Sequence, residues 1–392
     1  MKIATLLATV LALTWASHAQ ALDQIVEKQS FPMPSYTTVG GRTIKDVRIG
    51  YETYGTLNAA KTNAILVPHF FSGTSHVAGK YKADDKVAGY WDAIVGPGKP
   101  LDTDKYFIIG VDSLCNLNTR DGVTITTGPA STNPDTGKPY GTSFPVVQIR
   151  DFVNVQKALI EHLGISQLYA VAGLSMGGIQ SWEWAASYPD MVQRVIAVVS
   201  TPVLGPYSIA TVRQWADAVM LDAKWNKGDY YGKEEPVDGL TLAFKLINIE
   251  SRQPDWADAA FGRKPADPAA DPGADFANQY AIEKWLEDNS RARAKATDAN
   301  QFICLARANE LFQAGGKPTL EEGLAAIKAK VLLIPDRRDL LLFPEYSRQA
   351  RDILLRQGKT VEYFELPGQN GHLDGVTGIT EAGPTISRFL AQ

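Results

Sequence analysis

The stretch Gly173-Leu174-Ser175-Met176-Gly177 has the residue types and spacing of a nucleophile turn. It fits the pattern G-x-S-x-G, with a strand-like apolar run before it and a helix-like run after it. Glycines on both sides let the backbone make a strained turn that presents the Ser175 hydroxyl for attack on a carbonyl carbon. A turn that only tightens packing or receives a phosphate is the alternative, and the flanking strand and helix favour the nucleophile.

A serine hydroxyl needs a base to remove its proton, and that base is normally a histidine held by a carboxylate. After a nucleophile turn of this type, the acid and then the histidine follow the serine along the chain. Only His372 comes after Ser175; the other histidines are His18, His69, His76 and His162. The acid should follow the apolar run at 330–335, where Asp336 and Asp339 are both candidates.

The negative oxygen that forms during attack on a carbonyl needs backbone N–H donors. One is expected from Met176, the residue after the nucleophile, and one from the loop after an earlier strand. That loop lies in the segment 68–76, and Phe71 is its expected donor. We expect Phe70 beside it to line the substrate pocket.

Short β-branched runs alternate with amphipathic stretches, a pattern typical of a mostly parallel sheet flanked by helices. The expected strands are at 63–69, 105–113, 167–175, 194–200, 329–336 and 360–367. Helices are expected over 144–164 and 176–188. The sequence therefore predicts an α/β fold.

The alternation stops between 202 and 316, where a Trp-, Ala- and Asp-rich stretch indicates several helices and a Pro/Ala/Asp loop at 263–275. We interpret 202–316 as a helical cap inserted between two core segments, 22–201 and 317–392. Residues 1–21 have the charged start, the apolar run and the final Ala-x-Ala of a signal peptide. The mature chain should begin at Leu22 and be periplasmic or secreted.

Composition excludes some classes of partner. The chain has 392 residues and a formal net charge of −4, which favours neither nucleic acid nor, after removal of the signal, a membrane. A small acyl compound is the expected substrate. The two cysteines, Cys115 and Cys304, lack metal-ligand spacing and are either buried thiols or one disulfide. Neither a metal nor another cofactor is indicated.

With these residues identified, the chain resembles the homoserine O-acetyltransferase family of the α/β-hydrolase superfamily. The matching segments cover most of the mature chain and include YETYGTLN, SGTSHVAG, TGPASTNPDTGKPYG, GLSMGGIQSWEWAASYPD and NKGDYY. The resemblance implies an α/β-hydrolase fold, and a homodimer is consistent with it. It also favours Asp339 over Asp336, because the family's acid precedes an aromatic-Pro pair, here Phe343-Pro344.

The sequence departs from the family around the substrate. The family follows its catalytic histidine with an aspartate, whereas here Leu373 follows and the acid is one place later, at Asp374. The family's carboxylate-binding arginine aligns with Ala216, with Arg213 one turn away. We expect Arg213, Asp374 and Tyr230, which lies in NKGDYY, to contribute to the pocket.

These observations predict an exported serine hydrolase that acts through an acyl-enzyme on small acyl esters, or on thioesters or amides. Acetyl-CoA is a cytoplasmic metabolite, so water is the expected acyl acceptor outside the cytoplasm. An acyltransferase of the homoserine O-acetyltransferase type is the first alternative. A noncatalytic protein that binds a small molecule on the same fold is the second.

Overall fold

The computed structural model describes residues 25–392. Its main sheet has the strand order β1-β2-β6-β3-β9-β10-β11-β12. The strands are β1 (Gln29–Thr37), β2 (Thr43–Tyr54), β3 (Ala64–Pro68), β6 (Phe107–Val111), β9 (Ala170–Leu174), β10 (Arg194–Val198), β11 (Lys330–Ile334) and β12 (Val361–Tyr363). The strands from β6 to β12 run parallel, while β1 and β2 form an antiparallel extension at one edge. The predicted α/β fold is confirmed, and the β1–β2 hairpin is an addition to it.

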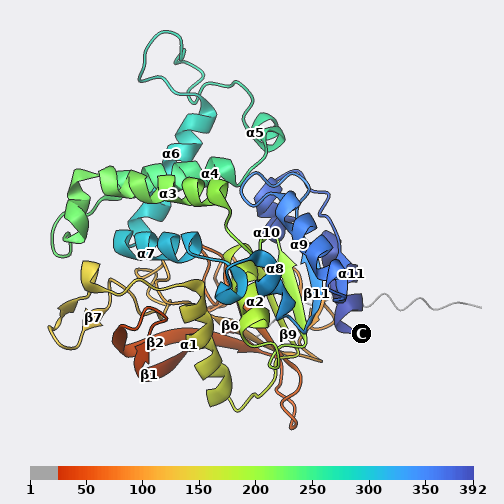
Figure 1. Cartoon of the computed structure of the whole chain (residues 1–392). Helices are drawn as coiled ribbons and strands as arrows, with labels where there is room; N and C mark the ends of the chain where they lie inside the picture. Colours follow the sequence, from red (N-terminus) through yellow and green to blue (C-terminus); the bar gives the residue numbers. More distant parts are fainter. Residues whose placement is uncertain (1–24) are drawn as a thin grey trace, which may run out of the picture.

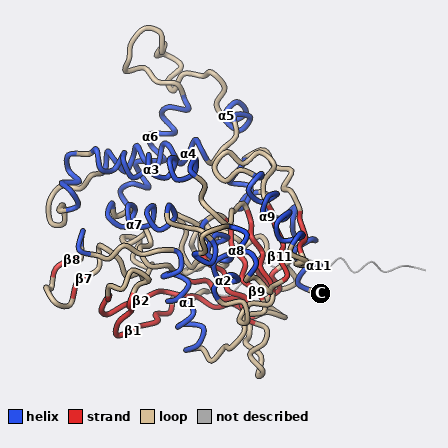
Figure 2. Tube along the Cα trace, viewed as in Figure 1, coloured by secondary structure: helices blue, strands red, loops and turns tan. Residues whose placement is uncertain are grey.

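Helices cover both faces of this sheet (Figures 1 and 2). The helices outside the insertion are α1 (Ile149–His162), α2 (Met176–Ser187), α8 (Leu320–Ala325), α9 (Pro344–Arg356), α10 (Asp374–Thr377) and α11 (Gly383–Leu390). Two small ladders, β4 (Val95–Gly96) with β5 (Leu101–Asp102) and β7 (Thr132–Asn133) with β8 (Lys138–Pro139), lie in loops.

Side chains on β3 alternate between two hydrophobic cores. Leu66 joins the core that contains α1 and α2, whereas Ile65 and Val67 join the core that contains α11. A strand buried on both faces is continuously apolar, which is why the run at 63–69 is readable from the sequence.

Helix α1 begins later than the sequence predicts. The backbone N–H of Gln148 donates to the Asp151 carboxylate at 2.7 Å, an arrangement typical of a helix start. Since Asp151 also accepts from Val39 N at 2.7 Å, this helix start is tied to the loop after β1. The helix therefore runs from Ile149 rather than from 144.

The inserted helices connect two strands that pair directly. β10 and β11 are parallel neighbours, and the chain between them forms α3 (Pro206–Leu221), α4 (Val237–Glu250), α5 (Pro254–Ala260), α6 (Ala281–Ala296) and α7 (Ala299–Glu310). We refer to α3 to α7 as the cap. In Figure 1, α3, α4 and α6 lie above the sheet, with α7 between them and the core.

The predicted signal peptide, 1–21, lies outside the described residues.

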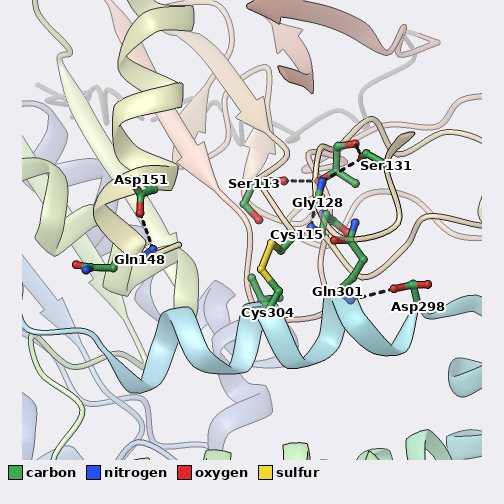
Figure 3. Close-up of a disulfide and its surroundings, with 12 residues drawn as sticks. Ser113, Cys115, Gly128, Ser131, Gln148, Asp151, Asp298, Gln301 and Cys304 are labelled. Atoms are coloured by element: carbon green, nitrogen blue, oxygen red, sulfur yellow. Dashed lines mark hydrogen bonds between the residues drawn. A yellow bond between two sulfur atoms is a disulfide. The ribbon is translucent and has the colours of Figure 1, made fainter. Parts of the chain in front are cut away.

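One disulfide joins the cap to the core. Cys304 on α7 is bonded to Cys115 in the loop after β6, with the two Cα atoms 6.1 Å apart (Figure 3). The sequence left the state of these two cysteines open, and the structure pairs them. In the described part of the chain, no helix is both long and apolar enough to cross a membrane.

Candidate active site

Ser175 lies in a tight turn between β9 and α2. Its backbone has φ 52° and ψ −123°, a conformation that non-glycine residues rarely adopt. The turn requires glycine on both sides, because a Cβ on Gly173 would lie 2.3 Å from the carbonyl carbon of Gly177, and a Cβ on Gly177 would lie 2.2 Å from Pro68 O. The G-x-S-x-G spacing thus follows from close backbone packing in the turn that presents the Ser175 hydroxyl to the cavity.

Ser175, His372 and Asp339 form a continuous hydrogen-bonded series. Ser175 Oγ lies 2.8 Å from His372 Nε2, and His372 Nδ1 lies 2.7 Å from Asp339 Oδ2. The other Asp339 oxygen accepts the backbone N–H groups of Leu341 and Leu342 at 2.8 and 3.0 Å. This arrangement gives His372 the tautomer with its proton on Nδ1, which leaves Nε2 free to accept the serine proton.

Asp336, the other candidate acid, lies at the end of β11 without a bond to His372. One of its oxygens accepts from Arg338 N at 2.8 Å, and the other is buried without a hydrogen-bond partner among residues 25–392. Burial, together with the nearby charges of Asp374 and Asp339, raises the pKa of Asp336 to about 6. The geometry therefore selects Asp339 as the partner of the histidine.

Ser175 and His372 line a cavity of about 120 Å³ between core and cap. The core contributes Phe70, Phe71, Ser72, Met176, Ile179, Leu341, Leu342 and Leu373. The cap and its connections contribute Leu204, Ser208, Val212, Trp215, Ile247, Asn248, Ser251, Arg252, Arg293 and Asn309. Phe70, the expected pocket residue, is part of this lining, and so is Phe71, the expected N–H donor.

Three expected pocket residues lie elsewhere. Arg213 is exposed on α3 and pairs with Asp217, one turn along the same helix, at 2.7 Å. Tyr230 is buried in the connection between α3 and α4, where its hydroxyl donates to Asp298 at 2.7 Å. Asp374 accepts from the backbone and side chain of Asn370 at 2.8 and 2.9 Å, so its carboxylate closes a loop instead of lining the cavity. Leu373 occupies the lining position beside His372.

His69 orients the peptide group between Phe70 and Phe71. Its Nε2 accepts Ser113 N–H at 3.0 Å, so Nδ1 carries the proton and donates to Phe70 O at 2.6 Å. In a trans peptide the C=O and N–H groups point in opposite directions, so this bond directs Phe71 N–H away from His69. Within residues 25–392 that N–H has no acceptor. It is therefore available to a ligand.

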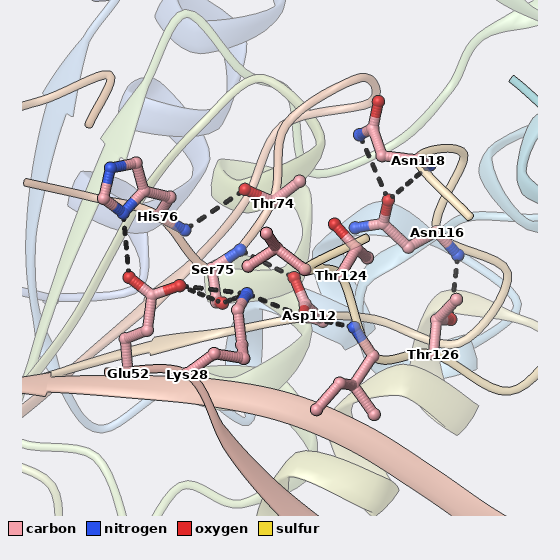
Figure 4. A network of polar contacts seen from close by, with 12 residues as sticks. Lys28, Glu52, Thr74, Ser75, His76, Asp112, Asn116, Asn118, Thr124 and Thr126 are labelled. Carbon is pink, nitrogen blue, oxygen red and sulfur yellow. Dashed lines mark hydrogen bonds and ion pairs between the residues drawn. The ribbon is translucent and has the colours of Figure 1, made fainter. Parts of the chain in front are cut away.

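A buried ionic network holds the far end of the same loop, as Figure 4 shows. Ser75 N donates to Asp112 at 2.7 Å, and Ser75 Oγ donates to Glu52 at 2.9 Å. Lys28 pairs with Glu52 at 2.9 Å and with Asp112 at 3.1 Å. Burial raises the pKa of Glu52, but the hydrogen bond to His76 and the charge of Lys28 outweigh it and lower this pKa to about 2. Glu52 thus stays ionised and keeps the loop anchored.

Replacing the His69 ring by a ring without nitrogens is expected to lower catalysis while a side chain of similar size still fills the position. In His69→Phe, Phe70 O loses its donor and the Phe71 amide loses its fixed direction, so kcat should fall about tenfold or more while KM changes little. His69→Asn, which retains a side-chain donor, should recover part of kcat. Steady-state kinetics on folded protein measures both. If KM instead rose about tenfold while kcat stayed unchanged, His69 would have no role in orienting this amide.

Residues 89–378 match the family model described as alpha/beta hydrolase fold. This result, with the sheet order and the turn at Ser175, defines an enzyme of the α/β-hydrolase superfamily. A homoserine O-acetyltransferase from Methanosphaerula palustris is 45% identical over 350 residues, which cover 89% of this chain and 70% of that relative. Another, from Carboxydothermus hydrogenoformans, is 39% identical over 370 residues, or 93% of this chain and 95% of that one. The chain belongs to the homoserine O-acetyltransferase family.

The solved structures similar to this chain include both an esterase and an acyltransferase. Esterase E22 shares 47% identity with a TM-score of 0.88, covering 93% of this chain and 100% of that one. Homoserine O-acetyltransferase from Bacillus anthracis shares 39% identity with a TM-score of 0.90, covering 94% and 98%. The backbone is thus shared by proteins named for two different reactions. Residues 25–392 contain no cluster of His, Cys, Asp and Glu arranged to hold a metal ion.

Proposed function

We propose that this protein transfers acyl groups through a covalent intermediate on Ser175. Ser175 Oγ attacks the carbonyl carbon of an ester while His372 Nε2 takes the hydroxyl proton, and Asp339 stabilises the imidazolium that forms. The N–H groups of Met176 and Phe71 donate to the negative oxygen. His372 then protonates the departing alcohol, which leaves the acyl-enzyme. The observation that carries this proposal is the unbroken series from Ser175 to Asp339 beside a cavity.

For the second half-reaction we propose water as the main acceptor, which makes the protein an esterase of small acyl esters, with thioesters or amides as further substrates. His372 removes a proton from water as the water oxygen attacks the acyl carbon. The bond from Ser175 Oγ to the acyl group then breaks, His372 returns the proton to Ser175 Oγ, and the acid leaves. An amino acid acceptor would need an anchor for its ammonium group. Leu373 provides none, and the Asp374 carboxylate is bound to Asn370. The similarity to esterase E22 supports the same assignment.

Acyl transfer to homoserine is the second candidate function. The curated relatives that share 37 to 45% identity with this chain are named homoserine O-acetyltransferases, which favours an alcohol acceptor. The acyl-enzyme would be the same in both reactions, and only the nucleophile in its breakdown differs. A noncatalytic binding protein would need no hydrogen-bonded Ser-His-Asp series.

A competition experiment separates the two candidates. The protein is given 4-nitrophenyl acetate in the presence and absence of homoserine, and both acetate and O-acetylhomoserine are quantified. Hydrolysis as the main reaction predicts acetate as the major product at every homoserine concentration. O-acetylhomoserine as the major product would instead establish the transferase. Leu373→Asp tests the anchor, since it should raise the share of transferred product.

We also propose that the protein acts outside the cytoplasm after removal of residues 1–21. The pairing of Cys115 with Cys304 supports this location, because disulfides persist in oxidising compartments. N-terminal sequencing of the protein recovered from its native compartment should begin at Leu22. An intact N-terminus on cytoplasmic protein would contradict export.

A further inference from the structure

Two arginines line the same cavity as Ser175. Arg252 follows α4, Arg293 lies on α6, and both are half-buried. Among the described residues, those that line this cavity include no aspartate and no glutamate, so no carboxylate of the lining can pair with the two arginines. Two neighbouring half-buried cations without a paired anion are unusual, because burying a charge costs free energy unless an opposite charge or hydrogen-bond acceptors compensate for it.

In the part of the chain that the structure describes, Arg293 has an aromatic neighbour but no paired anion. Its guanidinium carbon lies 4.4 Å from the centre of the Phe244 ring. Arg291, on the same helix, pairs with Glu287 and with Asp238 at 2.9 Å. For Arg293, by contrast, residues 25–392 provide neither an ion pair nor a side-chain hydrogen bond. Burial and then the charge of Arg252 lower the pKa of Arg293 to about 10, which still leaves it cationic near neutrality.

Arg252 is held in place beside it. Its Nη1 donates to the carbonyl and side-chain oxygens of Asn248 at 2.8 and 3.0 Å. Its guanidinium carbon lies 4.7 Å from the Trp256 ring and 5.0 Å from the Trp285 ring. These contacts fix the side chain but use only one of its nitrogens as a donor. The remaining donors have no acceptor in the described part of the chain.

We propose that Arg293 and Arg252 bind a carboxylate group of the substrate, so that this enzyme selects small acyl esters that carry a negative charge. A planar guanidinium matches a carboxylate with two parallel hydrogen bonds, and an anion between two cations relieves their repulsion. This inference rests on the proposed function, since it names the substrate class for the same site.

The carboxylate can lie on the acyl half or the alcohol half of the ester, and two substrate pairs distinguish these cases. For the acyl half, 4-nitrophenyl hydrogen glutarate is compared with neutral 4-nitrophenyl pentanoate. For the alcohol half, 4-acetoxybenzoate is compared with its neutral methyl ester. In wild type, one pair should show a higher kcat/KM for the anionic member. No anionic preference in either pair would overturn the proposal.

The variants test which residues cause that preference. In Arg293→Gln the ratio of kcat/KM for the anionic ester over the neutral one should fall about tenfold or more, since a hydrogen bond to a charged group is lost. Arg293→Lys should retain part of the ratio. Lys295→Gln removes an exposed charge from the same helix and should keep the wild-type ratio. An unchanged ratio in Arg293→Gln would overturn the proposal.

A binding measurement separates this proposal from the proposed catalysis. Glutarate should bind Ser175→Ala protein in calorimetry, and its Kd should rise about tenfold or more when Arg293→Gln is added. Binding that depends on Arg293 supports the anion site even if no ester is turned over. Turnover that depends on Ser175, without any binding of glutarate or preference for anionic esters, supports only the catalytic proposal.

Discussion

Ser175→Ala is expected to reduce the kcat for hydrolysis of a small aryl ester by about 10⁴-fold or more, because the whole covalent route requires the hydroxyl. The residual rate would come from the N–H donors and the cavity alone. A fluorophosphonate probe, which reacts with an activated serine, should label wild type and leave the variant unlabelled. The two measurements, rate and label, report on the same oxygen atom by independent chemistry.

The matched control for this experiment is Ser187→Ala. Ser187 is the last residue of α2, and its hydroxyl bonds Glu183 on the same helix, away from the cavity. The control should keep wild-type kinetics and full labelling by the probe. If Ser175→Ala retained the rate and label of this control, Ser175 would have no catalytic role.

Asp339→Asn is expected to lower kcat by about 10³- to 10⁴-fold, since the amide cannot hold the imidazole in the required tautomer or stabilise its positive charge. Because Asn retains an oxygen for the N–H groups of Leu341 and Leu342, the loop should keep its conformation. Steady-state kinetics together with circular dichroism tests this expectation. A kcat within about tenfold of wild type would require a different partner for His372.

Asp336→Asn is the comparison variant, and it should affect stability rather than catalysis. The pKa of Asp336 is raised from 3.8 to about 6 in the folded state. The folded protein therefore binds more protons than the unfolded chain between these values, and stability falls as pH rises through this range. Asn removes the buried charge, so Tm near neutrality should be equal to or above that of wild type, with kcat within about threefold.

The core of the fold is predictable because buried parallel strands are continuously apolar. The β1–β2 hairpin escaped prediction since β1 contains Pro32 and Pro34, which an edge strand tolerates but which interrupt a strand pattern. The start of α1 was also misplaced, because the preceding apolar residues continue the helical periodicity. The extended backbone of Gln148 and the contact between its N–H and Asp151 mark the observed start of the helix.

Some residues of the candidate site were likewise predictable from the sequence, and others were not. Ser175 and His372 follow from a local motif and from chain order, and the resemblance chose Asp339 over Asp336. The role of His69 could not be predicted from the sequence, because it depends on a hydrogen bond from Ser113, which follows the neighbouring strand β6. Arg252 and Arg293 gave no local signal either. They share the cavity only because of how the cap helices pack, which a sequence pattern does not encode.

The disulfide between Cys115 and Cys304 spans 189 positions and encloses the exposed loop at 263–275. A protease cut in that loop would therefore leave the two fragments covalently joined until the disulfide is reduced. Asp339 and His372 lie beyond Cys304 and so outside the closed ring that contains Ser175. A molecule nicked in the cap would carry its nucleophile on one fragment and its base and acid on the other.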